Sequence, residues 1–200
     1  MRKDKVGKFI KLEGELKVIF YTADLHLGHE SIIKISNRPF ITIEEHDRFI
    51  INNWNATVSD KDTVYIVGDF AHKNKESTKN YIKQLKGHKH LIIGNHDLYF
   101  KNVDYVNKKY FQSIEQMSMI KDGGYRVVLC HYPLAEWNGY FRGAYMIHGH
   151  IHNNRTNPSF EFLKSQDRAL NAGVDITNFK PVTLKELIVD NKAFKEKKPI

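Results

Sequence analysis

The chain has 200 residues, of which 41% are hydrophobic and 27% charged. This composition is typical of a globular protein and excludes a disordered or fibrous one. The length suffices for one domain, which we expect over residues 1–200. No apolar run is long enough to cross a bilayer, and no apolar signal-peptide core follows the first residues. The single cysteine, Cys130, excludes an intramolecular disulfide and a cysteine-rich zinc site. We therefore expect a cytoplasmic protein without membrane attachment. The formal net charge of +8 favours anionic partners such as nucleotides or nucleic acid, although much of the excess lies at the two ends of the chain.

The first half of the chain alternates strands with helices. A short apolar run predicts a buried strand over 18–21, and a weaker candidate edge strand precedes it over 9–12. Residues 31–36 predict a short helix, and a capping box at 42–45 opens a longer one with apolar residues at the helical period. Strands are predicted over 63–67 and 91–93, on either side of a helix over 75–86 that ends at Gly87. This alternation is typical of a parallel-rich α/β layer.

The second half is richer in predicted strands. Strands over 114–120 and 125–130 flank Gly123 and Gly124, which is a hairpin signal. Another strand over 144–147 leads into a histidine-rich segment, residues 153–167 predict a loop or short hairpin, and a last strand is expected over 169–175. A second capping box, at 183–186, opens a C-terminal helix.

Side chains of the kinds that bind metal ions follow five of these strands. They are Asp24 with His26, Asp69, Asn95 with His96 and Asp97, His131, and His150 with His152. Taken singly, the groups have ordinary alternatives: turns at Gly68-Asp69 and at 94–97, because Gly, Asn and Asp favour turns, a structural histidine at His131, and a histidine-rich surface loop at 148–152. Three histidines alternate over residues 148–152, which places their side chains on one face of an extended segment, and imidazole is the commonest protein metal ligand. Since ligands gather at the carboxyl ends of strands in open α/β sheets, the five groups together predict a metal site.

These five groups, taken in order, resemble the motifs of the calcineurin-like metallophosphoesterase superfamily. The matching segments are Asp24-Leu25-His26, Gly68-Asp69, Gly94-Asn95-His96-Asp97, His131 and Gly149-His150-Ile151-His152. The chain looks most similar to the small single-domain members found in bacteria and their phages. The resemblance implies an α/β fold with four layers, an αββα sandwich of two mixed sheets flanked by helices.

The resemblance also implies two divalent metal ions at the strand ends. The ligands carried over by motif are Asp24, His26 and His152 for one ion, Asn95, His131 and His150 for the other, and Asp69 as the bridge. A mixture of imidazole and oxygen ligands suits manganese, iron, zinc or nickel, of which we favour manganese. His96 is then expected to face the substrate and protonate the leaving oxygen, with Asp97 orienting its ring. A purely structural role for His96 is the alternative.

Other polar residues are candidates for supporting roles. Those for substrate contact are Arg38, His29, Asn37 and His72, with a solvated loop as the alternative; the guanidinium of Arg38 suits a phosphate, which it binds as a fork. Those for orienting the ligating histidines are His148, Asn171 and Asp175. We expect ordinary surface or helix positions for His46, His88 and His90.

The leading functional prediction is a two-metal phosphoesterase in which a metal-bridged hydroxide attacks the phosphate ester. The net charge and an aromatic cluster favour a phosphodiesterase acting on a nucleotide or nucleic acid, because aromatic rings stack on bases. That cluster comprises Tyr132, Trp137, Tyr140, Phe141 and Tyr145. The alternatives are a phosphomonoesterase, including a protein phosphatase; a non-catalytic scaffold stabilised by metal; and a nucleic-acid-binding protein without chemistry, which would rest on the basic chain ends alone.

Overall fold

The computed structural model describes residues 17–72, 75–97 and 109–196, and these form two four-stranded sheets. The first sheet has the order β1 (Ile19–Thr22), β2 (Thr63–Val67), β3 (His88–Ile92) and β4 (Ser113–Glu115), with parallel neighbours throughout. The second has the order β5 (Met117–Asp122), β6 (Tyr125–Cys130), β7 (Tyr145–His148) and β8 (Ala169–Asn171). Its β5–β6 pair is an antiparallel hairpin, whereas its other pairs are parallel. The second sheet is therefore mixed as expected, but the first is wholly parallel.

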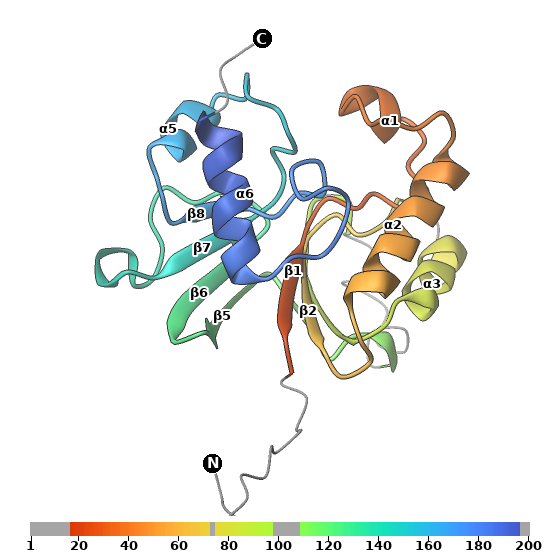
Figure 1. Cartoon of the computed structure of the whole chain (residues 1–200), viewed down its shortest axis with the longest axis horizontal. Helices are drawn as coiled ribbons and strands as arrows, with labels where there is room; N and C mark the ends of the chain where they lie inside the picture. Colours follow the sequence, from red (N-terminus) through yellow and green to blue (C-terminus); the bar gives the residue numbers. More distant parts are fainter. Residues whose placement is uncertain (1–16, 73–74, 98–108, 197–200) are drawn as a thin grey trace, which may run out of the picture.

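Helices complete four layers (Figure 1). They are α1 (Ile32–Ile35), α2 (Ile43–Thr57), α3 (Lys75–Gln84), α5 (Phe160–Lys164) and α6 (Leu184–Glu196), with a 3-10 turn, η2, at Tyr140–Arg142. In Figure 1, α2 and α3 cover the outer side of the first sheet and α5 lies beside the second, while α6 contacts both β8 and β1. The expected αββα sandwich is thus confirmed.

The alternation of side chains along the strands explains these layers. Along β1, Phe20 packs toward Trp54 of α2, whereas the next residue, Tyr21, points into the core between the sheets. Along β6, Leu129 faces that same inner core, and its neighbour Val128 packs on the outer side. Strands β1, β2, β7 and β8 are buried on both faces, so they read as nearly continuous apolar runs, whereas β5 exposes one face.

The strand prediction over 114–120 is wrong in one respect. The residues of that run belong to two strands: β4 pairs with β3 in the first sheet, and β5 pairs with β6 in the second. The chain passes between the sheets at Gln116, a change of partner that leaves no trace in a run of alternating side chains. The expected loop over 153–167 contains the short helix α5, and the last strand, β8, has only three residues of the seven expected. The candidate strand over 9–12 lies outside the described residues.

Both capping boxes are present. The Oγ1 atom of Thr42 accepts a hydrogen bond from the backbone N–H of Glu45 at 3.2 Å at the start of α2. At the start of α6, Glu186 N–H donates to Thr183 Oγ1 at 3.3 Å, and the Glu186 carboxylate accepts from the Thr183 backbone N–H at 2.8 Å. These bonds satisfy backbone donors that have no partner inside the helix.

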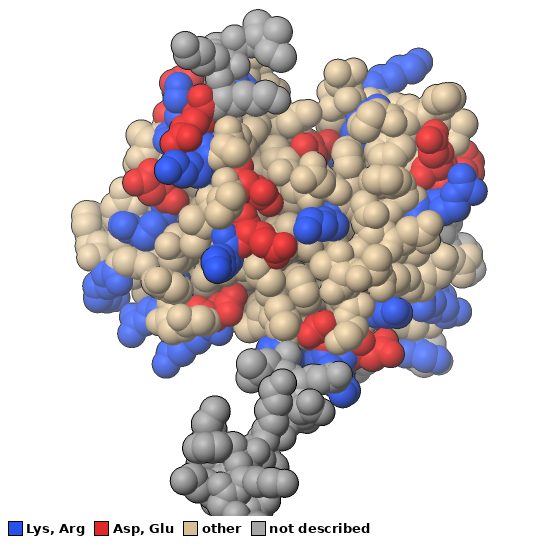
Figure 2. Space-filling model, viewed as in Figure 1, with Lys and Arg blue, Asp and Glu red and all other residues tan. Residues whose placement is uncertain are grey.

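The surface charge is dispersed on the face shown in Figure 2. There, Lys and Arg side chains of the described residues lie among Asp and Glu side chains and do not gather into one patch. Within the described part of the chain, no helix is both long enough and apolar enough to cross a membrane.

Candidate metal centre

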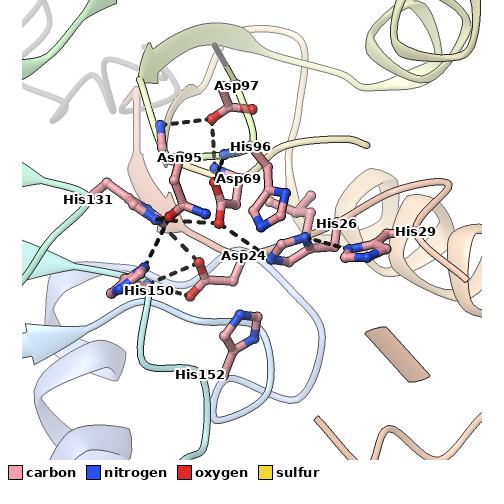
Figure 3. A network of polar contacts seen from close by, with 12 residues as sticks. Asp24, His26, His29, Asp69, Asn95, His96, Asp97, His131, His150 and His152 are labelled. Carbon is pink, nitrogen blue, oxygen red and sulfur yellow. Dashed lines mark hydrogen bonds and ion pairs between the residues drawn. The ribbon is translucent and has the colours of Figure 1, made fainter. Parts of the chain in front are cut away.

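The five polar groups converge at one end of the two sheets (Figure 3). Asp24 and His26 follow β1, Asp69 follows β2, Asn95 follows β3, His131 follows β6, and His150 and His152 follow β7. Because β1, β2 and β3 are mutually parallel, and β6 and β7 are as well, their carboxyl ends meet at the same edge of the sandwich. The structure therefore brings together all seven residues that the motifs single out as metal ligands.

Five of these seven residues hold an unusual backbone conformation. The φ angles are 57° at Asp24, 52° at His26, 55° at Asp69, 72° at His150 and 51° at His152. Among the described residues, only three other non-glycine positions have positive φ. Each such position costs about 1 kcal/mol or more and persists only where its surroundings enforce it, and such positions cluster at functional sites. The folded chain thus retains strain at the residues that point into the centre.

Asp24, His26 and His152 form the first candidate ligand group. Their ligand atoms lie within 4.8 Å of one another. The carboxylate of Asp24 is fully buried and accepts the backbone N–H of His150 at 3.0 Å. The Nε2 atom of His26 is buried without a hydrogen-bond partner among the described residues and lies 3.5 Å from Asp69 Oδ2. A buried nitrogen in this state is costly, and a cation would satisfy it.

The second candidate group surrounds the side chain of Asn95. Asn95 Oδ1 lies 3.1 Å from both His131 Nε2 and His150 Nδ1, and Asp69 Oδ2 lies 3.4 Å from His131 Nε2. The carbonyl oxygen of Val67 lies 2.9 Å from His131 Nδ1, so Nδ1 carries the proton and the Nε2 lone pair faces the centre. The same oxygen of Asp69 is close to histidines of both groups, which is the position required of a bridging carboxylate.

The electrostatics of the centre are dominated by buried carboxylates. Burial raises the pKa of Asp24. Burial opposes the charge of His131, but its hydrogen bond to Asp69 and the nearby carboxylates outweigh this and raise its pKa to about 9. Burial likewise opposes the charge of Asp69, yet the contact with His131 brings the net pKa below its usual value. The centre therefore attracts positive charge, and its imidazole, amide and carboxylate donors fit two divalent cations.

Glycines make room for these ligands. A Cβ atom on Gly94 would lie 2.2 Å from Asp69 Oδ1, and one on Gly149 would lie 2.9 Å from Asp24 Oδ2. Gly68 approaches the ring of His131 in the same way, with 2.1 Å to Nδ1. The glycines of the motifs thus serve close approach to the ligating side chains.

His96 lies at the centre, but Asp97 does not orient its ring. The ring of His96 is half-buried, 5.0 Å from that of His26 between centroids, and its backbone N–H donates to Asp69 Oδ1 at 2.8 Å. The buried carboxylate of Asp97 instead accepts three backbone N–H groups, those of Asp69 at 2.7 Å, Phe70 at 3.0 Å and Gly94 at 2.9 Å (Figure 3). Asp97 thus joins the loops after β2 and β3, and its expected catalytic role is replaced by a positioning role.

Arg38 does not contact the substrate side of the centre. Its guanidinium is buried and forms two hydrogen bonds with Asp175, at 2.8 and 3.0 Å. Nη1 donates to the carbonyl oxygen of Leu25 and lies 2.7 Å from His46 Nε2, and Nη2 also donates to the carbonyl oxygen of Asp24. All the donors face protein groups, so the expected phosphate contact is wrong and Arg38 acts as a buried clamp on the first motif.

The other substrate candidates divide into two places. His29 and His72 stack on each other with centroids 4.0 Å apart, and both rings lie within 6 Å of that of His96. His29 Nδ1 also lies 3.1 Å from His26 Nδ1, and burial together with the neighbouring histidines lowers the pKa of His29 to about 4. A neutral His29 can therefore accept a hydrogen bond from His26 Nδ1–H, leaving His26 Nε2 for a cation. Asn37 is exposed on another side, beside the histidines that follow β7.

Two of the three residues expected to orient the ligating histidines contact the His152 segment. Asp175 Oδ2 lies 3.0 Å from His152 Nδ1, and Asn171 Nδ2 donates to the backbone carbonyl of His152 at 2.7 Å. His148 is buried beside the motif, with its Nδ1 2.9 Å from the carbonyl oxygen of Gly149. Asp175 also binds Arg38, so one buried carboxylate connects the clamp to the His152 ligand.

The network behind Arg38 was not recognised from the sequence. His46, expected at an ordinary position, is fully buried, with its ring 2.8 Å from Asp47 Oδ1. Asp47 Oδ2 also accepts the backbone N–H of Gly28 at 3.0 Å and the Tyr81 hydroxyl. The available signal was that two polar residues occupy the apolar face of α2. Of the other two histidines assigned to ordinary positions, His88 is exposed, and His90 is half-buried in β3.

The aromatic residues expected to form one cluster lie in different environments. Tyr132 is half-exposed beside the centre, with its ring 4.6 Å from that of His150. Trp137 is buried in the outer core of the second sheet and packs edge-on against Tyr140, whereas Phe141 is exposed on the same loop. Only Tyr132 of this group contacts the histidines of the centre.

Comparisons with known proteins agree with this geometry. Residues 17–192 match the family model described as calcineurin-like phosphoesterase. An uncharacterized protein of Methanocaldococcus jannaschii is 35% identical over 176 residues, which cover 87% of this chain and 90% of that protein. The gene 66 protein of Mycobacterium phage L5 is 28% identical, covering 78% and 86% of the two chains. A crystal structure of a protein of unknown function from Aquifex aeolicus superposes with a TM-score of 0.68 at 28% identity, covering 86% of this chain and 97% of that one.

Proposed function

The chain belongs to the calcineurin-like phosphoesterase family, and we propose that it is a metal-dependent hydrolase of phosphate diesters, with nucleotides as the favoured substrate class. The observation that carries this proposal is the position of Asp69 Oδ2. This atom lies 3.5 Å from the unpartnered Nε2 of His26 and 3.4 Å from Nε2 of His131. One carboxylate oxygen thus serves both candidate ligand groups, and a scaffold that needed no ions would gain nothing from this arrangement of buried nitrogens.

Manganese is the ion we favour, because the donors mix imidazole with amide and carboxylate oxygens. When bound, two such ions would supply Lewis acidity toward the phosphate and lower the pKa of water. Asp24, His26 and His152 would hold one ion and Asn95, His131 and His150 the other, with Asp69 between them. The backbone strain and the Asp97 contacts described above fix these side chains in advance, so little reorganisation is needed on binding.

His96 is the residue we propose as the general acid. Its ring is half-buried beside the centre, and its ligand atom lies within 4.8 Å of those of His26 and Asp69, so it is close enough to act on a substrate held there. An imidazole in this place can donate a proton to the leaving oxygen of the ester as the bond to phosphorus breaks. The stacked His29 and His72 lie beside it.

Tyr132 is the observation that supports a nucleotide over a simple phosphate ester. Its half-exposed ring stands against His150, so an aromatic group on the substrate can stack there while the phosphate lies at the centre. The positive net charge favours an anionic substrate generally, although the charge is dispersed on the face in Figure 2.

The test compares hydrolysis of bis-(p-nitrophenyl) phosphate with that of p-nitrophenyl phosphate, with manganese and with a chelator present. We expect manganese-dependent turnover that favours the diester, that Asp69→Asn abolishes, and that His96→Asn lowers by about 100-fold while manganese binding stays intact. Preference for the monoester would replace the diesterase proposal with a phosphatase. Absence of any turnover in protein shown by calorimetry to bind two manganese ions would refute the proposed activity and favour a non-catalytic scaffold.

A further inference from the structure

A pocket of about 400 Å3 adjoins the metal centre on the side of α1. One wall comes from the end of α1 and the residues after it, including Ile35 and Asn37; the other comes from the segment after β7. His150 and His152 also line this pocket, so it is continuous with the candidate ligands of the phosphate site. Its volume falls within the range of small-molecule sites.

The walls of the pocket are polar but carry no carboxylate, lysine or arginine side chain. Four of the lining residues are asparagines, at positions 37, 153, 154 and 157. Asn153 Nδ2 donates to the carbonyl oxygen of Ser36 at 3.3 Å, which ties the two walls together. A second phosphate or an acidic peptide would find no lysine or arginine side chain here to bind it.

Two of the asparagine amides have a fixed orientation. Asn154 Oδ1 accepts the backbone N–H of Thr156 at 2.9 Å, and Asn157 Oδ1 accepts that of Ser159 at 2.9 Å. Because a backbone N–H requires an acceptor, these contacts identify the oxygen of each amide. No hydrogen bond among the described residues uses the Nδ2 atoms of Asn154 or Asn157, so each amide retains its donors for a ligand.

The remaining wall is apolar. The side chain of Ile35 is 69% exposed, so its apolar surface is accessible to a ligand in the pocket. A ligand that matches the pocket therefore has an apolar face, acceptor atoms at its edge and no charge. A nucleobase has these three properties, and a second phosphate group does not.

We propose that this pocket binds the nucleoside of a phosphodiester whose phosphate lies at the metal centre. The proposal rests on the function proposed above and specifies its substrate class. The nucleobase of one ester group lies against Ile35 and accepts hydrogen bonds from the amides of Asn154 and Asn157, while the other ester group lies toward Tyr132. A nucleoside ester is then preferred over an ester of the same phosphate with a small alcohol.

The experiment compares kcat/KM for the p-nitrophenyl ester of thymidine 5′-phosphate with that for methyl p-nitrophenyl phosphate, which has the same leaving group. We expect the thymidine ester to be favoured by about 10-fold or more in the wild type, as one or two hydrogen bonds and the apolar contact allow. Asn154→Asp keeps the acceptor for Thr156 but replaces the donor with an acceptor, so the ratio of the two kcat/KM values should fall by about 10-fold. Asn138→Asp, on the exposed loop that begins η2, is the matched control and should leave the ratio unchanged.

Equal kcat/KM values for the two esters in the wild type would overturn the pocket assignment, and so would an unchanged ratio in Asn154→Asp. If neither ester is hydrolysed, the proposed function fails separately, and binding of thymidine 5′-monophosphate and of methyl phosphate is compared by calorimetry in the manganese-loaded protein. Tighter binding of the nucleotide that Asn154→Asp removes supports the pocket, and equal binding of the two overturns it.

Discussion

Arg38→Met is the change that separates the two roles considered for Arg38. The guanidinium has no exposed surface and lies against Asp175, which is equally buried, with side-chain exposures of 0% and 1%. Methionine fills most of the same volume but has no donor and no charge. The substitution therefore leaves the Asp175 carboxylate in the interior without its main counter-charge.

The cost can be estimated from the contacts. Five donor contacts at about 1.5–3 kcal/mol each would sum to about as much as a typical domain's entire stability, so simple addition overstates the effect. Removing one partner of a buried ion pair costs about 3–5 kcal/mol. Because Asp175 Oδ2 keeps its contact with His152 at 3.0 Å, we expect the lower end, about 3 kcal/mol. In a chain of 200 residues this corresponds to a Tm lower by about 6–12 °C.

The assay is urea unfolding followed by circular dichroism, with Arg48→Met as the control. Arg48 is exposed on α2 and should change the free energy of unfolding by less than about 0.5 kcal/mol. Arg38→Lys should recover only part of the loss, because an ammonium group cannot form the two-point contact with Asp175. Unchanged stability in Arg38→Met combined with a higher KM for a phosphodiester would refute the clamp and restore the phosphate contact.

Three further changes test separate parts of the structure. His29→Phe keeps the stack on His72 but removes the partner of His26 Nδ1, so calorimetry should show manganese binding weakened by about 10–100-fold; unchanged affinity would remove His29 from any positioning role. Gly94→Ala should destabilise the fold by about 1–3 kcal/mol in urea, because the new Cβ would lie 2.2 Å from a carboxylate oxygen; an unchanged free energy of unfolding would contradict this. Burial lowers the pKa of Lys195 to about 8 from 10.5, so between these pH values the unfolded chain binds a proton that the folded chain does not. The free energy of unfolding of the wild type relative to that of Lys195→Met should therefore rise with pH. A difference in unfolding free energy that does not change with pH would contradict this prediction.

The sequence specified the layers and the location of the centre well, for a physical reason. Strands buried on both faces appear as continuous apolar runs, and the residue types that follow them are polar and few. Asp69 and His131 were therefore recognisable as members of one site although 62 positions separate them in the printed sequence. Helix starts were equally clear, because the capping boxes at Thr42 and Thr183 are local interactions.

Features that depend on partners distant in sequence were not predictable in the same way. Arg38 and Asp175 are 137 positions apart, and no local pattern indicates that they meet. An arginine just after a ligand motif suggested phosphate, because that is what an exposed guanidinium binds. Gln116 illustrates the same limit for the fold, since the change from one sheet to the other depends on which strands lie beside it.

The roles of Asp97 and Arg38 point to how the centre is held in place. Both were expected near the substrate, and both instead bind the backbone of the loops that carry the ligands: Asp97 binds the N–H groups after β2, and Arg38 binds the carbonyls of Asp24 and Leu25. Those loops contain the positive-φ residues Asp24 and Asp69, whose conformation is unfavourable on its own. Hydrogen bonds from buried charged groups are among the strong ones, and here they are directed at the strained segments. The two charged side chains that the sequence suggested for substrate binding and catalysis therefore stabilise the backbone geometry of the loops that carry the ligands.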